Sequence, residues 1–161
     1  MALGKRVLRP VRLVLKSDTA VALNANFDAY VAADYDPAKL ELVPGETPTV
    51  FVVQQLTSTQ KLRVYAEGSA FAQCTAALRY GLIGLEGYQV LRPDGGVDVL
   101  PPPEREPAEG GSAVKLKWLE EANLPMDHIY AVGSVVMSIS EAKAPLSRPS
   151  ATPSGPGGLS A

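Results

Sequence analysis

A change of hydrophobic period near residue 57 constrains the fold of this chain more than any other feature. Residues 49–56, Thr-Val-Phe-Val-Val-Gln-Gln-Leu, are rich in β-branched side chains, which is typical of a strand. Thr57-Ser-Thr-Gln60 then has the capping-box form, in which Thr57 and Gln60 bond to early backbone N–H groups. Leu62 and Tyr65 follow at helical spacing. The sequence therefore predicts a strand that leads directly into a helix.

A second helical pattern follows this first helix. Gly68-Ser69 is expected to interrupt the chain between the two patterns, although one kinked helix and two separate helices both fit the spacing. The apolar stripe of the second pattern consists of Phe71, Cys74, Thr75, Leu78 and Leu82. Cys74 lies on this stripe, so we expect it to be a small buried residue.

The C-terminal half predicts a hairpin and two further helices. Tyr88–Leu91 and Val97–Leu100 flank Arg92-Pro-Asp-Gly-Gly96, and apolar runs around Pro-Asp-Gly indicate a hairpin. Residues 104–112 resemble a polar Pro/Gly linker. Apolar spacing then predicts helices over residues 114–123 and 126–140.

The N-terminal region predicts mainly β structure. Val11–Lys16 alternates apolar and basic residues, as a half-buried strand does. Residues 24–48 are mixed, with a short strand candidate at residues 39–43. Strands that precede helices favour an α+β fold: a small antiparallel sheet and hairpins with two pairs of amphipathic helices. The predicted organisation is an N-terminal arm (residues 1–10), a single domain (11–142) and a Pro/Gly/Ser-rich tail (143–161), expected to be disordered alone or extended over a partner.

Composition narrows the classes of function and of compartment. The chain has 161 residues, 46% of them apolar and 20% charged, with a net charge of −2. This balance offers no general attraction for nucleic acid or an anionic membrane. A single cysteine excludes an internal disulfide and a cysteine-based metal cluster. We expect no signal peptide and no membrane-spanning helix, and therefore a cytosolic chain or a component of an assembly built in the cytosol.

Charge is unevenly distributed near the N-terminus. The basic residues that precede the first acid are Lys5, Arg6, Arg9, Arg12 and Lys16, and residues 18–46 are mainly acidic. This arrangement is typical of contact with a charged partner or between neighbouring copies, but solvated strand edges and an ordinary N-terminus are the favoured explanation. The arm lacks the interleaved aromatic residues of a single-strand binder. Nucleic-acid binding through this arm is a third hypothesis, and not the one that the sequence favours.

Three glycines, Gly81, Gly84 and Gly87, raise the question of a nucleotide site. A dinucleotide fingerprint needs a strand before the glycines and a helix after them, and here the expected order is reversed. No Lys-Ser or Lys-Thr pair completes a phosphate loop. The favoured interpretation is a left-handed glycine at the end of a helix, followed by a turn.

No residue pattern points to catalysis. His128 is the only histidine, and its neighbour Asp127 points elsewhere on a helix, so we expect His128 at a surface or a helix start. Trp118 is interpreted either as a core residue of an amphipathic helix or as an exposed anchor for a partner. The sequence therefore predicts a protein that is not an enzyme, with no catalytic, cofactor-binding or metal-binding residue. The candidate partner contacts are Lys5, Arg6, Arg9, Arg12 and Trp118.

Residues 48–141 carry a series of short motifs in a fixed order. A strand is followed by a Leu-Thr-Ser helix start, here Leu56-Thr57-Ser58. An Ala-Leu-Arg-aromatic-Gly-Leu stretch follows, here residues 77–82, and then an Asp-Gly turn, here Asp94-Gly95. A helix with a central tryptophan comes next, here at Lys117-Trp118-Leu119. In these motifs residues 48–141 resemble a group of small tailed-bacteriophage morphogenesis proteins. The sequence departs from the pattern at Leu85, where the group has tryptophan.

The resemblance implies a non-catalytic structural or assembly protein that acts through protein–protein contacts in the virion, at the head, connector or tail. Its expected partners are other phage structural proteins and further copies of itself, and its expected location is the virion, assembled in the host cytoplasm. A tail-assembly chaperone that does not stay in the virion is the alternative. A small ligand-binding or enzymatic domain is a more remote one.

Overall fold

The computed structural model of this protein describes residues 10–141. The predicted arm up to residue 9 and the predicted tail over residues 143–161 lie outside the described residues. In chain order the elements are β1 (Val11–Leu13), α1 (Phe27–Ala32), the 3-10 helix η1 (Pro37–Lys39), β2 (Val50–Val53), α2 (Ser58–Tyr65), α3 (Ala70–Gly81), β3 (Leu82–Glu86), β4 (Gln89–Leu91), β5 (Val97–Val99), β6 (Arg105–Ala108), β7 (Gly111–Val114), α4 (Leu116–Ala122) and α5 (Met126–Ser140). The helices and small antiparallel sheets confirm the predicted α+β class.

The central sheet is antiparallel, with β2 between β1 and β3. Leu13 lies opposite Phe51, and Phe51 lies opposite Leu85. Residues directly opposite each other share a face of the sheet, so these side chains form one row. All members of the row are at most 5% exposed. This row is the apolar surface on which the helices pack.

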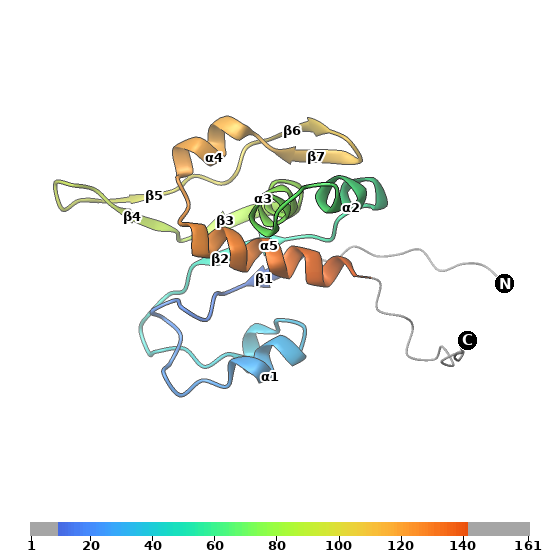
Figure 1. The fold of residues 1–161 in the computed structure, drawn as a ribbon. Helices are drawn as coiled ribbons and strands as arrows, with labels where there is room; N and C mark the ends of the chain where they lie inside the picture. The colour runs from blue at the N-terminus through green and yellow to red at the C-terminus, as the bar shows by residue number, and fades with distance from the viewer. Residues whose placement is uncertain (1–9, 142–161) are drawn as a thin grey trace, which may run out of the picture.

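Helices α3 and α5 pack along each other over the sheet (Figure 1). A Cβ atom at Gly133 would lie 2.3 Å from the Cys74 carbonyl oxygen, so the two helices approach at a distance that only glycine permits. Cys74 is buried, as predicted. The helical part of the main core consists of Val64, Ala77, Leu78, Trp118, Ala122, Val132 and Val136.

A smaller apolar cluster joins α1 to the sheet. It consists of Val14, Val21, Tyr30 and Leu40. The fully buried Tyr30 hydroxyl accepts a hydrogen bond from the Val14 N–H at 3.0 Å and donates one to the Arg12 carbonyl at 3.0 Å. These bonds hold α1 beside β1. The strand predicted at residues 39–43 is wrong, because η1 ends at Lys39 and Leu42 forms only an isolated bridge with Val21.

The predicted helix starts agree with the structure. Thr57 caps α2, and both halves of its capping box with Gln60 are present, at 3.0 and 3.3 Å. The Ser69 side chain caps α3 in turn. The chain at residues 58–81 therefore forms two separate helices, which decides between the alternatives that the spacing left open.

The glycine stretch differs from its prediction. Residues 82–86 form β3, so Leu82 does not extend the helical stripe and Gly84 is not in a turn. Gly81 has no positive φ angle; it is required because a Cβ atom there would lie 2.5 Å from a Val136 methyl carbon. Of the three glycines only Gly87 is left-handed, with φ of +70°. Pairing with the distant β2 supplies the backbone partners of β3, and local periodicity cannot reveal such a pairing.

Two hairpins follow β3. The predicted Pro-Asp-Gly hairpin is confirmed as β4 and β5, with Gly95 in the left-handed region. The linker predicted over residues 104–112 is wrong, because β6 and β7 pair there as a second hairpin. The Arg105 guanidinium donates hydrogen bonds to the Tyr80 and Ser112 carbonyls at 2.8 and 2.9 Å, and this attachment to the end of α3 orders the polar segment.

Candidate interaction site

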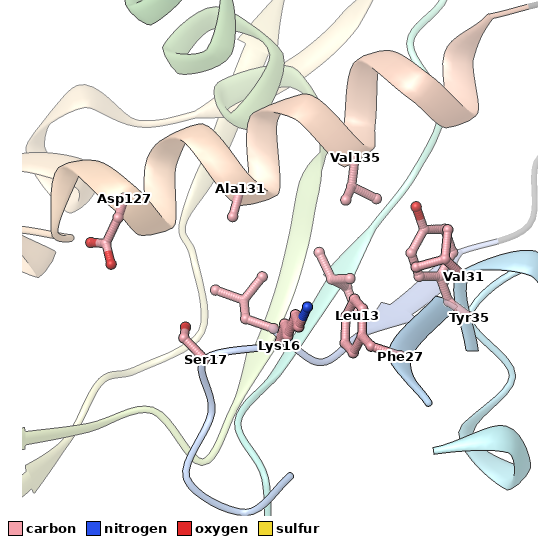
Figure 2. A pocket seen from close by; sticks show the side chains of 10 residues that line it. Leu13, Lys16, Ser17, Phe27, Val31, Tyr35, Asp127, Ala131 and Val135 are labelled. Atoms are coloured by element: carbon pink, nitrogen blue, oxygen red, sulfur yellow. The ribbon is translucent and has the colours of Figure 1, made fainter. Parts of the chain in front are cut away.

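An apolar groove runs between α5 and the α1 region. It has a volume of about 370 Å³ and is lined by Leu13, Leu15, Lys16, Ser17, Phe27, Val31, Tyr35, Asp127, Ala131 and Val135. Figure 2 shows Ala131 and Val135 on the α5 side, opposite Leu13 and the rings of Phe27 and Tyr35. Pockets of roughly 300–1,000 Å³ with mainly apolar walls are typical binding sites. The groove is therefore the first candidate for a contact with another molecule.

Local sequence patterns place the groove walls. Ala131 and Val135 are four residues apart on α5, and so are Phe27 and Val31 on α1, so each pair lies on one helix face. The Tyr30 hydrogen bonds hold α1 beside β1. A space remains between α1 and α5. The groove is thus the space between α1 and α5, with Leu13 of β1 in its lining.

The polar groups of the groove are spread along it. Asp127, near the start of α5, and Ser17 lie at one end, the Lys16 ammonium lies near the middle, and Tyr35 lies at the other end (Figure 2). Lys16 is exposed and has no ion pair within residues 10–141. Its ammonium group is consequently available to an acidic partner.

A second, polar hollow of about 320 Å³ adjoins the groove at Leu15 and Ser17. It is lined by Leu15, Ser17, Asp18, Thr19, Thr49, Phe51, Tyr88, Gln89 and His128. The two Asp18 carboxylate oxygens accept hydrogen bonds from the Ala20 N–H at 2.9 Å and the Thr49 N–H at 2.8 Å. Asp18 therefore fixes the chain backbone on one wall, and both its oxygens are already engaged.

His128 is half-buried in this hollow, at the start of α5. Its Nδ1 atom lies 2.9 Å from the Tyr88 hydroxyl, and its ring meets Phe51 edge-on. Burial, and then the charge of Asp127, raise the pKa of Tyr88, so its hydroxyl stays protonated. The pair joins the segment before β4 to α5, which is a structural contact between two elements. A catalytic histidine is usually oriented by a carboxylate, and here tyrosine occupies that position.

The β4–β5 hairpin presents the second candidate surface. Leu91 lies opposite Val97 and Gln89 opposite Val99, so these side chains share one face of the two-stranded ribbon. Leu91, Val97 and Val99 are 73%, 52% and 60% exposed. Figure 1 shows the hairpin extending away from the helices. It is an apolar face on a projecting arm.

The opposite face of this hairpin carries charge. Arg92 forms ion pairs with Asp94 at 3.2 Å and with Asp98 at 2.6 Å. Both pairs lie within the hairpin itself. Its charged groups stabilise the turn, and the apolar face stays more than half exposed, although Val99 at its base lines a hollow beside Trp118 and Ala122.

The residues that the sequence predicts to contact a partner do not lie together in the structure. Lys5, Arg6 and Arg9 lie outside the described residues. Arg12 forms a two-armed ion pair with Glu86 at 2.7 Å, and this bond lowers the pKa of the Glu86 carboxyl. Arg12 therefore joins β1 to β3 across the exposed face of the sheet. Its side chain is 50% exposed, so only part of it can contact a partner.

Trp118 is a core residue. It is 4% exposed, and its indole N–H donates a hydrogen bond to the Pro101 carbonyl at 3.3 Å. This is the first of the two interpretations of the sequence, and the buried ring offers almost no surface to a partner. The groove and the hairpin face were missed at the sequence level. The alternation of Leu91 and of Val97-Asp-Val99 carried a signal for the hairpin face, whereas the groove joins segments far apart in the chain.

The structure and the comparisons add three findings. Within residues 10–141 no group of three or more His, Cys, Asp or Glu side chains is arranged to hold a metal ion. In the same part of the chain, no helix is both long enough and apolar enough to cross a membrane. Comparison of the chain with protein-family models, with curated proteins and with solved structures found no match.

Proposed function

We propose that this chain is a non-catalytic structural or assembly protein of a tailed bacteriophage, and that it acts in the virion through protein–protein contacts. The sequence resemblance over residues 48–141 supports the phage context. The exposed apolar face of the β4–β5 hairpin supports the mode of action. The proposal places the protein in the head, connector or tail region, with other structural proteins as partners.

The hairpin face is the observation that carries the proposal. An isolated two-stranded hairpin is marginally stable in water, and it gains little by displaying leucine and valine to solvent. Burying one such side chain completely stabilises a contact by about 1.5–3 kcal/mol. Leu91, Val97 and Val99 are more than half exposed, so each can contribute a substantial part of this energy at an interface. A partner that covers the face accounts for both the sequence and the shape of the arm.

Mass spectrometry of purified phage particles tests the proposal. The gene is expressed in its phage context, particles are purified on a density gradient, and their proteins are identified and quantified. We expect peptides of this chain at a constant ratio to the major virion proteins. A particle preparation from cells that express an unrelated tagged protein controls for contaminants.

The same experiment separates the alternatives. A chain that is abundant in infected cells but absent from particles is a tail-assembly chaperone, and the virion proposal is then wrong. A chain that is absent from particles and is stabilised saturably by a small molecule belongs to the ligand-binding alternative. In that case the groove beside α5 and the polar hollow at His128 are the places to map the ligand.

A further inference from the structure

The chain carries two apolar surfaces of opposite shape. The β4–β5 hairpin projects from the body (Figure 1), and the groove between α5 and α1 is a hollow (Figure 2). Both lack a cover within the described residues. A foreign partner that fits one surface leaves the other exposed. If the hairpin of one copy binds the groove of the next copy, a single kind of contact buries both surfaces.

We propose that the β4–β5 hairpin of one copy seats in the α5–α1 groove of the next copy, so that the chain assembles head to tail. This inference deepens the proposed function and rests on it, because a repeated structural role needs contacts between copies. A head-to-tail contact uses two different surfaces of each copy. It closes into a ring when the rotation between copies permits, and otherwise it grows into a filament.

The dimensions of the two surfaces agree. Val97 and Val99 are two residues apart on a strand, which places them about 7 Å apart along the hairpin. Ala131 and Val135 are four residues apart on a helix, which places them about 6 Å apart along the groove. The apolar face of the hairpin therefore matches the apolar length of the α5 wall.

Charge complementarity favours a second copy as the occupant. The hairpin, residues 89–99, contains two aspartates and one arginine, so its acids are in excess. The groove presents Lys16, which has no ion pair within the described part of the chain. The side chain of Asp94 in the turn is 69% exposed. Lys16 lies between Asp127 at one end of the groove and Tyr35 at the other (Figure 2), so a hairpin that enters with its turn toward Tyr35 brings Asp94 to Lys16 and keeps it away from Asp127.

Complementation between two variants tests this contact. Leu91→Gln with Val99→Thr makes the hairpin face polar, and Val31→Glu places a charge in the groove at a position that is 40% exposed. The purified full-length proteins are studied by size-exclusion chromatography with light scattering over a range of concentrations. The wild-type chain is expected to show concentration-dependent species larger than a dimer. Each variant alone is expected to be monomeric.

The mixture of the two variants is the decisive sample. The hairpin variant keeps an intact groove, and the groove variant keeps an intact hairpin, so one productive contact remains. We expect a heterodimer and no larger species. Leu62→Gln is the matched control, because Leu62 is 74% exposed on α2 and Leu91 is 73% exposed. This control should assemble as the wild type does, and circular dichroism confirms that every variant is folded.

Several results would overturn the inference. A monomeric wild-type chain excludes self-association through these surfaces. Assembly that survives Val31→Glu but is lost with the hairpin variant indicates hairpin-to-hairpin pairing instead. An equal loss with Leu62→Gln indicates unspecific apolar association. These outcomes are independent of the particle inventory: a chain found in virions but monomeric in solution contradicts the inference alone, and a self-assembling chain absent from virions contradicts the virion role alone.

Discussion

The two hairpins of this protein are alike in local structure and opposite in their relation to the body. All strand residues of β4–β5 are exposed, and its ion pairs lie within the hairpin. In β6–β7, Ala113 and Val114 are buried, and Arg105 donates to carbonyls at the end of α3. Arg63 on α2 also pairs with Glu109 in the β6–β7 turn. The β6–β7 hairpin is therefore part of the folded core. The β4–β5 hairpin keeps an exposed apolar face, and burial of this face can still stabilise a contact with another molecule.

Turn glycines provide the strongest test of this difference. Gly110 has φ of +73°, and a Cβ atom there would lie 2.6 Å from the Thr57 hydroxyl oxygen, which caps α2. Gly110→Ala should lower the free energy of unfolding by about 2–4 kcal/mol, because left-handed strain adds to overpacking. Gly95 has φ of +87° with open space around it. Gly95→Ala should therefore cost only the strain, about 1–2 kcal/mol.

Urea denaturation measures both variants under the same conditions. The wild-type midpoint and slope serve as the reference. Equal losses for the two alanine variants would show that the β6–β7 turn is no better attached than the β4–β5 turn.

The two hairpin arginines give the next largest contrast. Arg105→Ala removes the donor to the Tyr80 and Ser112 carbonyls, and we expect a loss of about 2–3 kcal/mol in the free energy of unfolding, since hydrogen bonds from charged donors are strong. Arg92→Ala removes two exposed ion pairs and should change stability by at most about 0.5 kcal/mol.

Chemical denaturation again measures the effect, now with Arg105→Lys as the conservative variant. Lysine keeps the charge but cannot reach several carbonyls at once, so it should recover only part of the loss. Full recovery would mean that the charge of Arg105, and not its fork of donors, attaches the hairpin.

The smallest expected effect is a local response to pH in the β4–β5 turn. The Gly96 N–H, and then Arg92, hold the pKa of the Asp94 carboxyl below its ordinary value of about 3.9. A lowered pKa in the folded state means that the carboxylate supports the turn above this ordinary value. The support is lost as the pH falls through the lower folded-state pKa. The free energy of unfolding of the whole protein should hardly respond, because the β4–β5 hairpin makes few contacts with the rest of the protein.

Amide chemical shifts recorded by NMR across this acidic range show the response. The shift changes should centre on residues 94–96 and disappear in Asp94→Asn. Amides of β7 provide the internal reference. A cooperative loss of structure throughout the protein at the Asp94 titration would mean that the arm and the body are one unit.

Some elements of the fold follow from the sequence because their signals are local. The Thr57 capping box, the Pro-Asp-Gly turn and the apolar spacing over Met126–Ser140 each depend on residues within a few positions of one another. Cys74 was also predicted correctly, since its place on the apolar stripe implies burial. The helix α1 was not predicted, because its stability depends on the Tyr30 hydrogen bonds to β1.

The candidate site was much less accessible from sequence than the helices were. Distinctive side-chain chemistry in the sequence points to His128, Trp118 and the basic N-terminal arm. The groove instead unites Leu13, Phe27 and Val135, which are ordinary apolar residues far apart in the chain. Their role depends on an empty space between elements, and such a space has no local pattern.

The sequence by itself determined where α2 and α5 begin, where Pro-Asp-Gly reverses the chain, and that the fold is α+β. Tertiary structure alone decided that residues 82–86 are a strand, since their backbone partners lie on β2. It also decided that residues 104–114 are a hairpin, because Arg105 connects them to carbonyls of α3 and β3. The physical reason is the range of the interactions: caps and turns form within a few residues, whereas sheet pairing, helix contact and grooves require segments brought together by the whole core.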